Sequence, residues 1–246
     1  MRTETIYGMH TVRVMLERHP ERVHSVRIAE RREDPRVRAI DALAQRHRRP
    51  VQRVDAQTLK QLLGDVAHQG VAADITPLPP WTEDELLAAL AGAKAPLLLA
   101  LDGVQDPQNL GACLRSADAC GALAVIVPRD RAAQLTPSAR KVAVGAAETT
   151  PVVSVTNLVR TLKLLKEAGL WVVGADVGAE TSAHEADLRG PVVLALGAEG
   201  TGLRHLTRQT CDFLVRLPQL GAVESLNVSV AAGMLLYEAV RQRQAQ

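Results

Sequence analysis

Three polar segments of the chain contain the side chains best suited to chemistry, and each directly follows an apolar run. After PLLLAL, the segment DGVQDPQNLGACLRSADACG contains Asn109 and Arg115. After PVVLAL, the segment GAEGTGL holds Glu199 among glycines. After FLVRL, the segment PQLGAVESLNVSVAAG contains Ser225 and Asn227. Glycines that follow a strand often let the backbone approach a nucleotide closely, so a nucleotide-like ligand is one expectation.

The glycine spacing around Glu199 distinguishes between kinds of nucleotide loop. Gly197, Gly200 and Gly202 give the order GxxGxG, whereas a dinucleotide fingerprint needs GxGxxG and an acidic residue about 20 positions later. Asp212 comes too early to be that acid, and no GK[ST] follows to indicate a phosphate loop. The glycines can instead shape a turn around an adenosine-like ligand, or form only a tight bend.

Each candidate side chain also has an ordinary structural explanation. Asn109 can cap a helix, and Arg115 can be an exposed charge on that helix. Ser225 can cap the last helix, while Leu217 and Leu226 can either pack in the core or sandwich a base. The joint occurrence of the polar groups at three strand ends of one sheet is what favours a shared site.

The elements that would position these groups alternate strongly after residue 95. Strands are expected at 96–101, 122–127, 151–155, 170–175, 191–196 and 213–217. Helices are expected near 109–120, 137–147, 156–168, 203–210 and 225–243. Strands that are apolar throughout are buried on both faces, which predicts an α/β fold with a mainly parallel sheet covered by helices. Ligands of such sheets bind beyond the carboxyl ends of the strands, which the three polar segments follow.

The proline-rich segment TPLPPW at 76–81 divides the chain, because its prolines oppose both a helix and a central strand. Before this break, apolar periodicity alternates between helix and strand and predicts a small α/β domain over 1–76. A linker with one short helix, TEDELLAALAG, is expected over 77–94, and the larger domain over 95–246.

Composition argues against several classes of protein. The start MRTETIYGMH lacks the apolar core of a secretory signal, and the run APLLLAL is far shorter than the roughly 20 residues that cross a bilayer. We therefore expect a cytoplasmic protein with no membrane partner. Cys113, Cys120 and Cys211 lack CxxC spacing, and the seven histidines are scattered, so no metal site is expected.

The charge is small overall but unevenly distributed. The net charge is +2, yet residues 1–60 contain 14 Lys and Arg against 8 Asp and Glu. A basic front half suggests a polyanion partner, although solvated helix faces would give the same count. Aromatic residues make up only 2% of the chain, too few for a face that stacks several unpaired bases. Any RNA would therefore be held by its phosphates and its shape.

The three polar segments resemble the three signature motifs of the SpoU methyltransferases, a branch of the SPOUT superfamily. DPQNLGACLRSADACG is similar to the first motif, LALGAEGTGL to the second and LPQLGAVESLNVSVAAG to the third. IYGMHTV and HQGV resemble the small RNA-binding extension of the family. The resemblance covers essentially the whole chain. One departure is Gln219, which stands where the family usually has Met in the cofactor turn.

This resemblance implies a SPOUT catalytic domain with a trefoil knot, preceded by a ribosomal-protein-like RNA-binding domain. It implies S-adenosylmethionine as the cofactor, bent in the knot, and a homodimer in which each active site draws on both subunits. The likeness is greatest to enzymes that methylate the ribose 2′-hydroxyl of a guanosine in the peptidyl-transferase region of 23S rRNA. The expected partner is therefore 23S rRNA or a ribosomal precursor particle.

The resemblance also assigns roles to residues of this chain. It implies that the reacting ribose is surrounded by Asn109, Arg115, Glu199, Ser225 and Asn227. It implies that the cofactor is held at Gly197, Gly200, Leu217 and Leu226. The family often casts the motif arginine as the base, but a guanidinium stays protonated near neutral pH. We expect Arg115 to hold a phosphate and stabilise the developing 2′-oxyanion, while Glu199 orients Arg115 or a nearby amide.

Three alternatives stay open on the sequence. The same motifs serve enzymes that methylate nucleotides in tRNA loops. A non-catalytic RNA-binding protein could retain the scaffold, although all the polar residues of the motifs are present. A nicotinamide-dependent oxidoreductase would fit the α/β alternation, but the glycine order argues against it.

Overall fold

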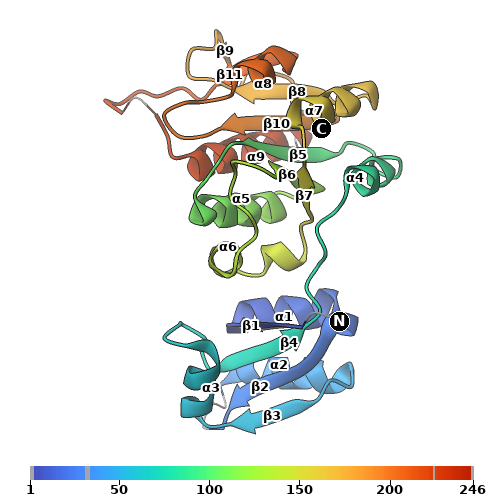
Figure 1. The fold of residues 1–246 in the computed structure, drawn as a ribbon, viewed down its shortest axis with the longest axis vertical. Coiled ribbons are helices and arrows are strands. Elements are labelled where there is room, and N and C mark those ends of the chain that lie inside the picture. The colour runs from blue at the N-terminus through green and yellow to red at the C-terminus, as the bar shows by residue number, and fades with distance from the viewer. Residues whose placement is uncertain (1–2, 31–33, 224, 245–246) are drawn as a thin grey trace. The chain divides into compact units, whose positions relative to one another are not determined.

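The computed structural model describes residues 3–30, 34–223 and 225–244 of the chain. It divides into two compact units, residues 1–78 and 79–246, and each has a sheet of its own (Figure 1).

The first unit is a four-stranded sheet in the order β1-β4-β2-β3. β4 pairs antiparallel with β1 and β2, whereas β2 and β3 are parallel. Its strands are β1 (Glu4–Tyr7), β2 (Val23–Ala29), β3 (Val51–Val54) and β4 (Val71–Ile75). Its helices are α1 (Met9–Arg18), η1 (Pro20–Arg22), α2 (Pro35–Arg46) and α3 (Ala56–Leu63). The sequence reasoning missed β1, whose four residues are too few for a clear period.

The core of the first unit comes from the apolar faces of α1, α2 and the sheet. The fully buried side chains Met15, Leu16, Ile28 and Ile40 belong to one continuous cluster. Inside the sheet, the Arg27 guanidinium donates two hydrogen bonds to Asp74 and lowers the pKa of that carboxyl group.

The second unit is a seven-stranded sheet in the order β7-β6-β5-β10-β8-β11-β9, and every strand pair in it is parallel. Its strands are β5 (Leu97–Asp102), β6 (Ala124–Pro128), β7 (Val152–Val155), β8 (Trp171–Ala175), β9 (Thr181–Ser182), β10 (Val192–Gly197) and β11 (Phe213–Arg216). The predicted parallel sheet is confirmed. Only the two-residue edge strand β9 was not expected.

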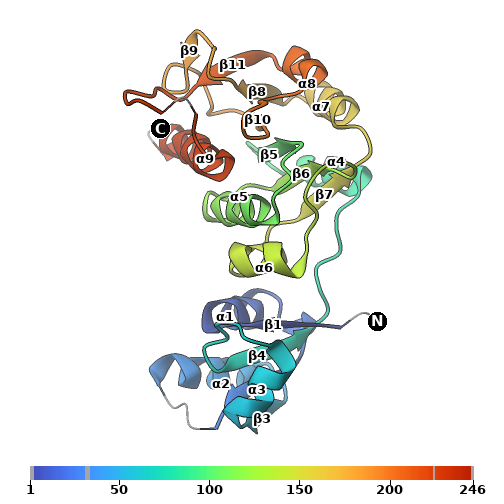
Figure 2. The same cartoon turned by 60° about the vertical axis from the view of Figure 1, so that its left-hand side comes forward.

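Helices cover both faces of this sheet. The helices are α4 (Glu83–Leu90), α5 (Pro107–Ala119), α6 (Pro137–Ala143), η2 (Ala146–Glu148), α7 (Leu158–Glu167), α8 (His205–Thr210) and α9 (Val228–Gln244). In Figure 2, α5, α6 and α9 lie on one side of the strands and α4, α7 and α8 on the other. Along β5, Leu97, Leu99 and Leu101 pack on the face covered by α5 and α9, whereas Leu98 and Ala100 pack on the face covered by α4 and α7. This two-sided burial explains why the strands are apolar throughout.

Candidate active site

The pairing of two central strands brings the first two polar segments together. β5 and β10 are parallel neighbours, and their last residues, Asp102 and Gly197, face each other in register. The loops that leave these strands therefore begin side by side at the carboxyl edge of the sheet.

Asn109 lies in the first turn of α5, and its side chain faces Glu199 in the loop after β10. Asp106, not Asn109, caps this helix, because its carboxylate accepts a hydrogen bond from the Gln108 N–H at 2.9 Å. Pro107 occupies the first helical position, where its missing N–H costs nothing. The capping explanation of Asn109 is thus wrong, and its amide is available for other contacts.

The loop after β10 folds back on itself tightly. The Gly202 N–H donates to the carbonyl of Ala198 at 2.9 Å, and Gly200 and Gly202 have φ of +77° and +65°. A Cβ on Gly197 would lie 1.9 Å from the backbone carbon of Gly202. Gly197 is therefore required by space, and the two later glycines by backbone conformation. This turn holds Glu199 at its tip.

Asn227 begins α9. Its Oδ1 accepts hydrogen bonds from the N–H groups of Ser229 and Val230, at 2.9 and 3.4 Å, and from the Ser229 hydroxyl. The expectation that Ser225 caps the last helix is therefore wrong, because Asn227 does so. Its cap fixes the direction of the amide, so that Nδ2 points away from the helix.

Glu199 is the centre of a three-residue hydrogen-bond network. Its Oε1 accepts from Nδ2 of Asn109 at 3.3 Å and from Nδ2 of Asn227. Asn227 Nδ2 also donates to Oδ1 of Asn109 at 3.0 Å. The backbone N–H of Val228 donates to Glu199 Oε1 at 3.2 Å, so the carboxylate lies at the N-terminus of α9, where an anion is favoured. The three predicted polar residues are thus in mutual contact.

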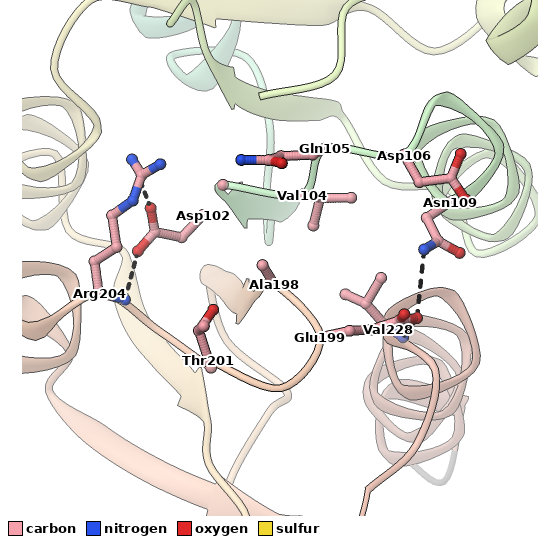
Figure 3. A pocket seen from close by; sticks show the side chains of 12 residues that line it. Asp102, Val104, Gln105, Asp106, Asn109, Ala198, Glu199, Thr201, Arg204 and Val228 are labelled. Carbon is pink, nitrogen blue, oxygen red and sulfur yellow. Dashed lines mark hydrogen bonds and ion pairs between the residues drawn. The ribbon is translucent and has the colours of Figure 1, made fainter. Parts of the chain in front are cut away.

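A cavity of about 470 Å³ adjoins this network. Asn109, Glu199 and Val228 bound one end of it, and Asp102 and Arg204 the other (Figure 3). Gln105, Asp106 and Thr201 also line it. Its size and its polar walls at the carboxyl ends of parallel strands suit a nucleotide-like ligand.

The other predicted residues do not join the network. Arg115 is exposed on α5, six residues beyond Asn109 and therefore about 120° away from it around the helix. Ser225 is exposed, and Leu226 is half-buried beside it. Leu217, just after β11, is partly buried against the core layer that contains α9.

Sequence reasoning missed two residues that shape the cavity, Asp102 and Arg204. Asp102 is 1% exposed, and its Oδ2 accepts a hydrogen bond from the Arg204 backbone N–H at 2.9 Å. Its Oδ1 lies 3.4 Å from Nη1 of the same arginine. The available signal was a carboxylate at the end of a wholly apolar strand, where burial demands a partner.

A buried thiol also lies near the site, but it is suited to packing and not to attack. Cys113 is one turn beyond Asn109 and fully buried, and burial raises the pKa of its thiol to about 12. Because the thiolate is the reactive form, Cys113 is unreactive at neutral pH. Among the described residues there is no cluster of three or more His, Cys, Asp or Glu that could hold a metal ion.

Comparison with known families decides what kind of protein carries this site. Residues 96–237 match the model of the SpoU rRNA Methylase family. The chain belongs to the SpoU rRNA methylase family. Residues 5–81 match a second SpoU-associated model, described as RNA 2′-O ribose methyltransferase substrate binding. The family resemblance of the sequence motifs is therefore confirmed.

Full-length SpoU relatives are similar to this chain along both units. A 23S rRNA (guanosine-2′-O-)-methyltransferase RlmB of Pseudomonas syringae pv. tomato is 54% identical, over 99% of this chain and 97% of that protein. The RlmB of Escherichia coli is 47% identical, over 98% of this chain and 99% of that protein.

A solved SpoU structure has the same fold. The SpoU methyltransferase AviRb of Streptomyces viridochromogenes, solved in complex with AdoMet, superposes with a TM-score of 0.78. It is 26% identical, and the match covers 99% of this chain and 91% of that one. The expected SPOUT-type α/β fold with a front substrate-binding domain is confirmed.

Proposed function

We propose that this chain transfers a methyl group from S-adenosylmethionine to the ribose 2′-hydroxyl of a guanosine in 23S rRNA. The contact of Asn109, Glu199 and Asn227 beside a nucleotide-sized cavity carries the proposal. Relatives named for this reaction, similar over their whole length, support the choice of substrate.

The loops at the carboxyl edge fit S-adenosylmethionine. A Cβ on Gly200 would meet open space, so the backbone of the turn is accessible to a ligand. The half-buried Leu217 and Leu226 offer apolar surface for an adenine. We assign these three residues and Gly197 to the cofactor. Bound there, the cofactor supplies a methyl group on a good leaving group.

The chain's own task is then orientation and charge. Asn109 holds the ribose through its second amide N–H. Asn227 lies beside the ribose and, together with Glu199, fixes the Asn109 amide. Ser225 holds the turn before α9 and contacts the substrate. Arg115 stabilises the developing 2′-oxyanion, with a phosphate oxygen of the substrate accepting the proton.

We further propose a homodimer in which each site takes Arg115 from the partner. Arg115 is exposed and turned away from Asn109 in its own chain, so a second copy can supply it. Val230, Met234 and Tyr237 are spaced along one face of α9 and are 49%, 51% and 66% exposed. An apolar stripe of this kind suits a contact between two copies.

The path of the chain around β8 supports a trefoil knot. In the sheet, β8 lies between β10 and β11. After β11 the chain comes back to the end of β10, where Asn227 contacts Glu199. We propose that this returning segment is threaded as in other SPOUT proteins.

The first unit is proposed to bind the substrate, 23S rRNA or a ribosomal precursor particle. The proposed limits are 1–76 for this substrate-binding domain, 77–94 for the linker and 95–246 for the catalytic domain. Its match to a substrate-binding model and its basic composition support this role. A cytoplasmic location follows from such a partner. No helix in the described part of the chain is long and apolar enough to cross a membrane.

Mapping 2′-O-methyl groups in rRNA and tRNA from cells that lack this protein tests the proposal. We expect one guanosine of 23S rRNA to lose its methyl group and to regain it when the gene is restored. Loss of a methyl group from a tRNA nucleotide alone would contradict the assignment to rRNA.

A further inference from the structure

The cavity has a second polar end that the methyl-transfer roles leave unused. There, the buried Asp102 engages Arg204 twice, through the backbone N–H and through the guanidinium. Oδ1 of Asp102 accepts no hydrogen bond from the residues that the structure describes, and its nearest cation is that guanidinium. A buried carboxylate is costly unless it is paired, so Asp102 holds the arginine in place at the cavity wall.

Arg204 is held at this wall yet open to ligand. Its side chain is 48% exposed and lines the cavity. The lack of a side chain at Gly103 makes room for it, because a Cβ there would lie 2.8 Å from Nη2 of Arg204. Nη2 also lies 3.4 Å from the carbonyl oxygen of Arg131. A guanidinium fixed in advance loses little conformational entropy when it binds an anion.

A neighbouring loop is fastened to this end of the cavity. The Ala133 N–H donates to the carbonyl of Val104 in the cavity wall at 2.7 Å, which fastens the loop that contains Arg129 and Arg131. The Gln134 amide secures the same loop through hydrogen bonds to three backbone carbonyls. Arg129 and Arg131 are both exposed, and Arg129 is paired with Asp130. Arg204 is thus the arginine that lines this end of the cavity, and the fastened loop supports its guanidinium through the Arg131 carbonyl oxygen.

We propose that Arg204 binds a phosphate of the RNA strand next to the target ribose. The proposal rests on the proposed function, since it takes the ligand of this cavity to be RNA. A planar guanidinium matches two phosphate oxygens, and a cation held in place favours an anion over the neutral edge of a base. Arg204 would then set the register of the strand, so that the 2′-hydroxyl meets Asn109 and Glu199.

Salt-dependent binding of an unmodified 23S rRNA fragment tests this directly. Each phosphate contact to a single strand contributes about 0.7 to the slope of log Kd against log salt concentration. We expect Arg204→Ala to lower that slope by about this amount and to weaken binding roughly tenfold at low salt. Affinity for S-adenosylmethionine, measured by calorimetry, is expected to stay unchanged.

Two further variants guard against misfolding and general charge effects. Arg204→Ala leaves Asp102 buried without its cation, so the double variant Asp102→Asn/Arg204→Met removes both charges together and is expected to show the same lowered slope. Arg189→Ala is the matched control. Arg189 is 52% exposed and paired with Asp187, but it precedes β10, at the opposite end of the strand from Arg204. For Arg189→Ala, the slope of log Kd against log salt concentration is expected to equal that of the wild type.

The outcomes separate this proposal from the proposed function. If the wild-type protein methylates the RNA and both Arg204 variants show the same salt slope of RNA binding as the wild type, the phosphate assignment is overturned. The same holds if the slope is unchanged and the variants instead lose discrimination between guanosine and adenosine at the target, because Arg204 would then contact the base. If the wild-type protein neither binds nor methylates the RNA, the proposed function itself fails.

Discussion

Asn227 contacts Glu199 through one end of its amide while the other end caps α9. Oδ1 accepts from the N–H groups of Ser229 and Val230, which forces Nδ2 toward Glu199 Oε1. The start of a 17-residue helix thereby fixes the orientation of a side chain in the site. Fold stability and site geometry are coupled at this residue, and substitutions can separate them.

Replacing Asn227 with Ser is expected to keep the cap and lose the site contact. A serine hydroxyl caps helices well but cannot also reach Glu199. Asn227→Ala should lose both, at a cost of about 1 kcal/mol in unfolding free energy. We therefore expect both variants to lose methyl transfer on the order of a hundredfold, with only the alanine variant less stable in urea. Full activity of Asn227→Ser would show that the Asn227 amide has no role in methyl transfer.

Gly197 and Gly200 are expected to respond differently to alanine. A Cβ at Gly197 collides with the Gly202 backbone, so Gly197→Ala must open the turn and should abolish cofactor binding. A Cβ at Gly200 meets open space and only strains a φ of +77°, at about 1 kcal/mol. Calorimetry with S-adenosylmethionine and thermal unfolding would compare the two. Equal loss of binding in both variants would contradict this reading of the turn.

The ion pair of Glu238 and Arg241 on α9 predicts a specific acid sensitivity. Two hydrogen bonds from Arg241 lower the pKa of Glu238 to about 2 despite its burial, against about 4.3 in an unfolded chain. A lowered pKa contributes stability that is complete above the unfolded value and lost as the pH falls toward the folded one.

We therefore expect Glu238→Gln to be less stable than the wild type at neutral pH. Urea unfolding at several pH values should show the difference shrinking below about pH 5 and vanishing near pH 2. Glu167→Gln, at an exposed position on α7, serves as the control with little change. A difference that does not depend on pH would refute the assignment.

The three thiols are expected to be slow to alkylate in the folded protein. Burial raises the pKa of Cys113 to about 12 and that of Cys211 to about 11, and it also raises that of the half-buried Cys120. Little thiolate therefore forms at pH 8. Mass spectrometry after iodoacetamide treatment should find all three modified in urea and Cys113 protected without it. Rapid native labelling of Cys113 would show that α5 opens.

The sequence predicted that Asn109, Glu199 and Asn227 lie together, because parallel strands end at one edge of a sheet and these groups follow three of those ends. It did not predict that Arg115 and Ser225 lie outside this network in the same chain. It could not settle which residue caps each helix. Asp106 and Asn109 are both capping types three positions apart, as are Ser225 and Asn227 two positions apart, and only the backbone path decides between them. Local composition likewise carries no information on the insertion of β10 between β5 and β8. That insertion brings Asp102 and Arg204 together, so their pairing was missed.

Transfer of a labelled methyl group from S-adenosylmethionine to unmodified 23S rRNA, followed by complete alkaline hydrolysis, tests the central claim most directly. A 2′-O-methyl group protects the adjacent phosphodiester bond. The account therefore predicts label in an alkali-resistant dinucleotide that begins with guanosine, and none with Asn109→Ala or Glu199→Ala. Label on a base, or equal transfer by those variants, would contradict it.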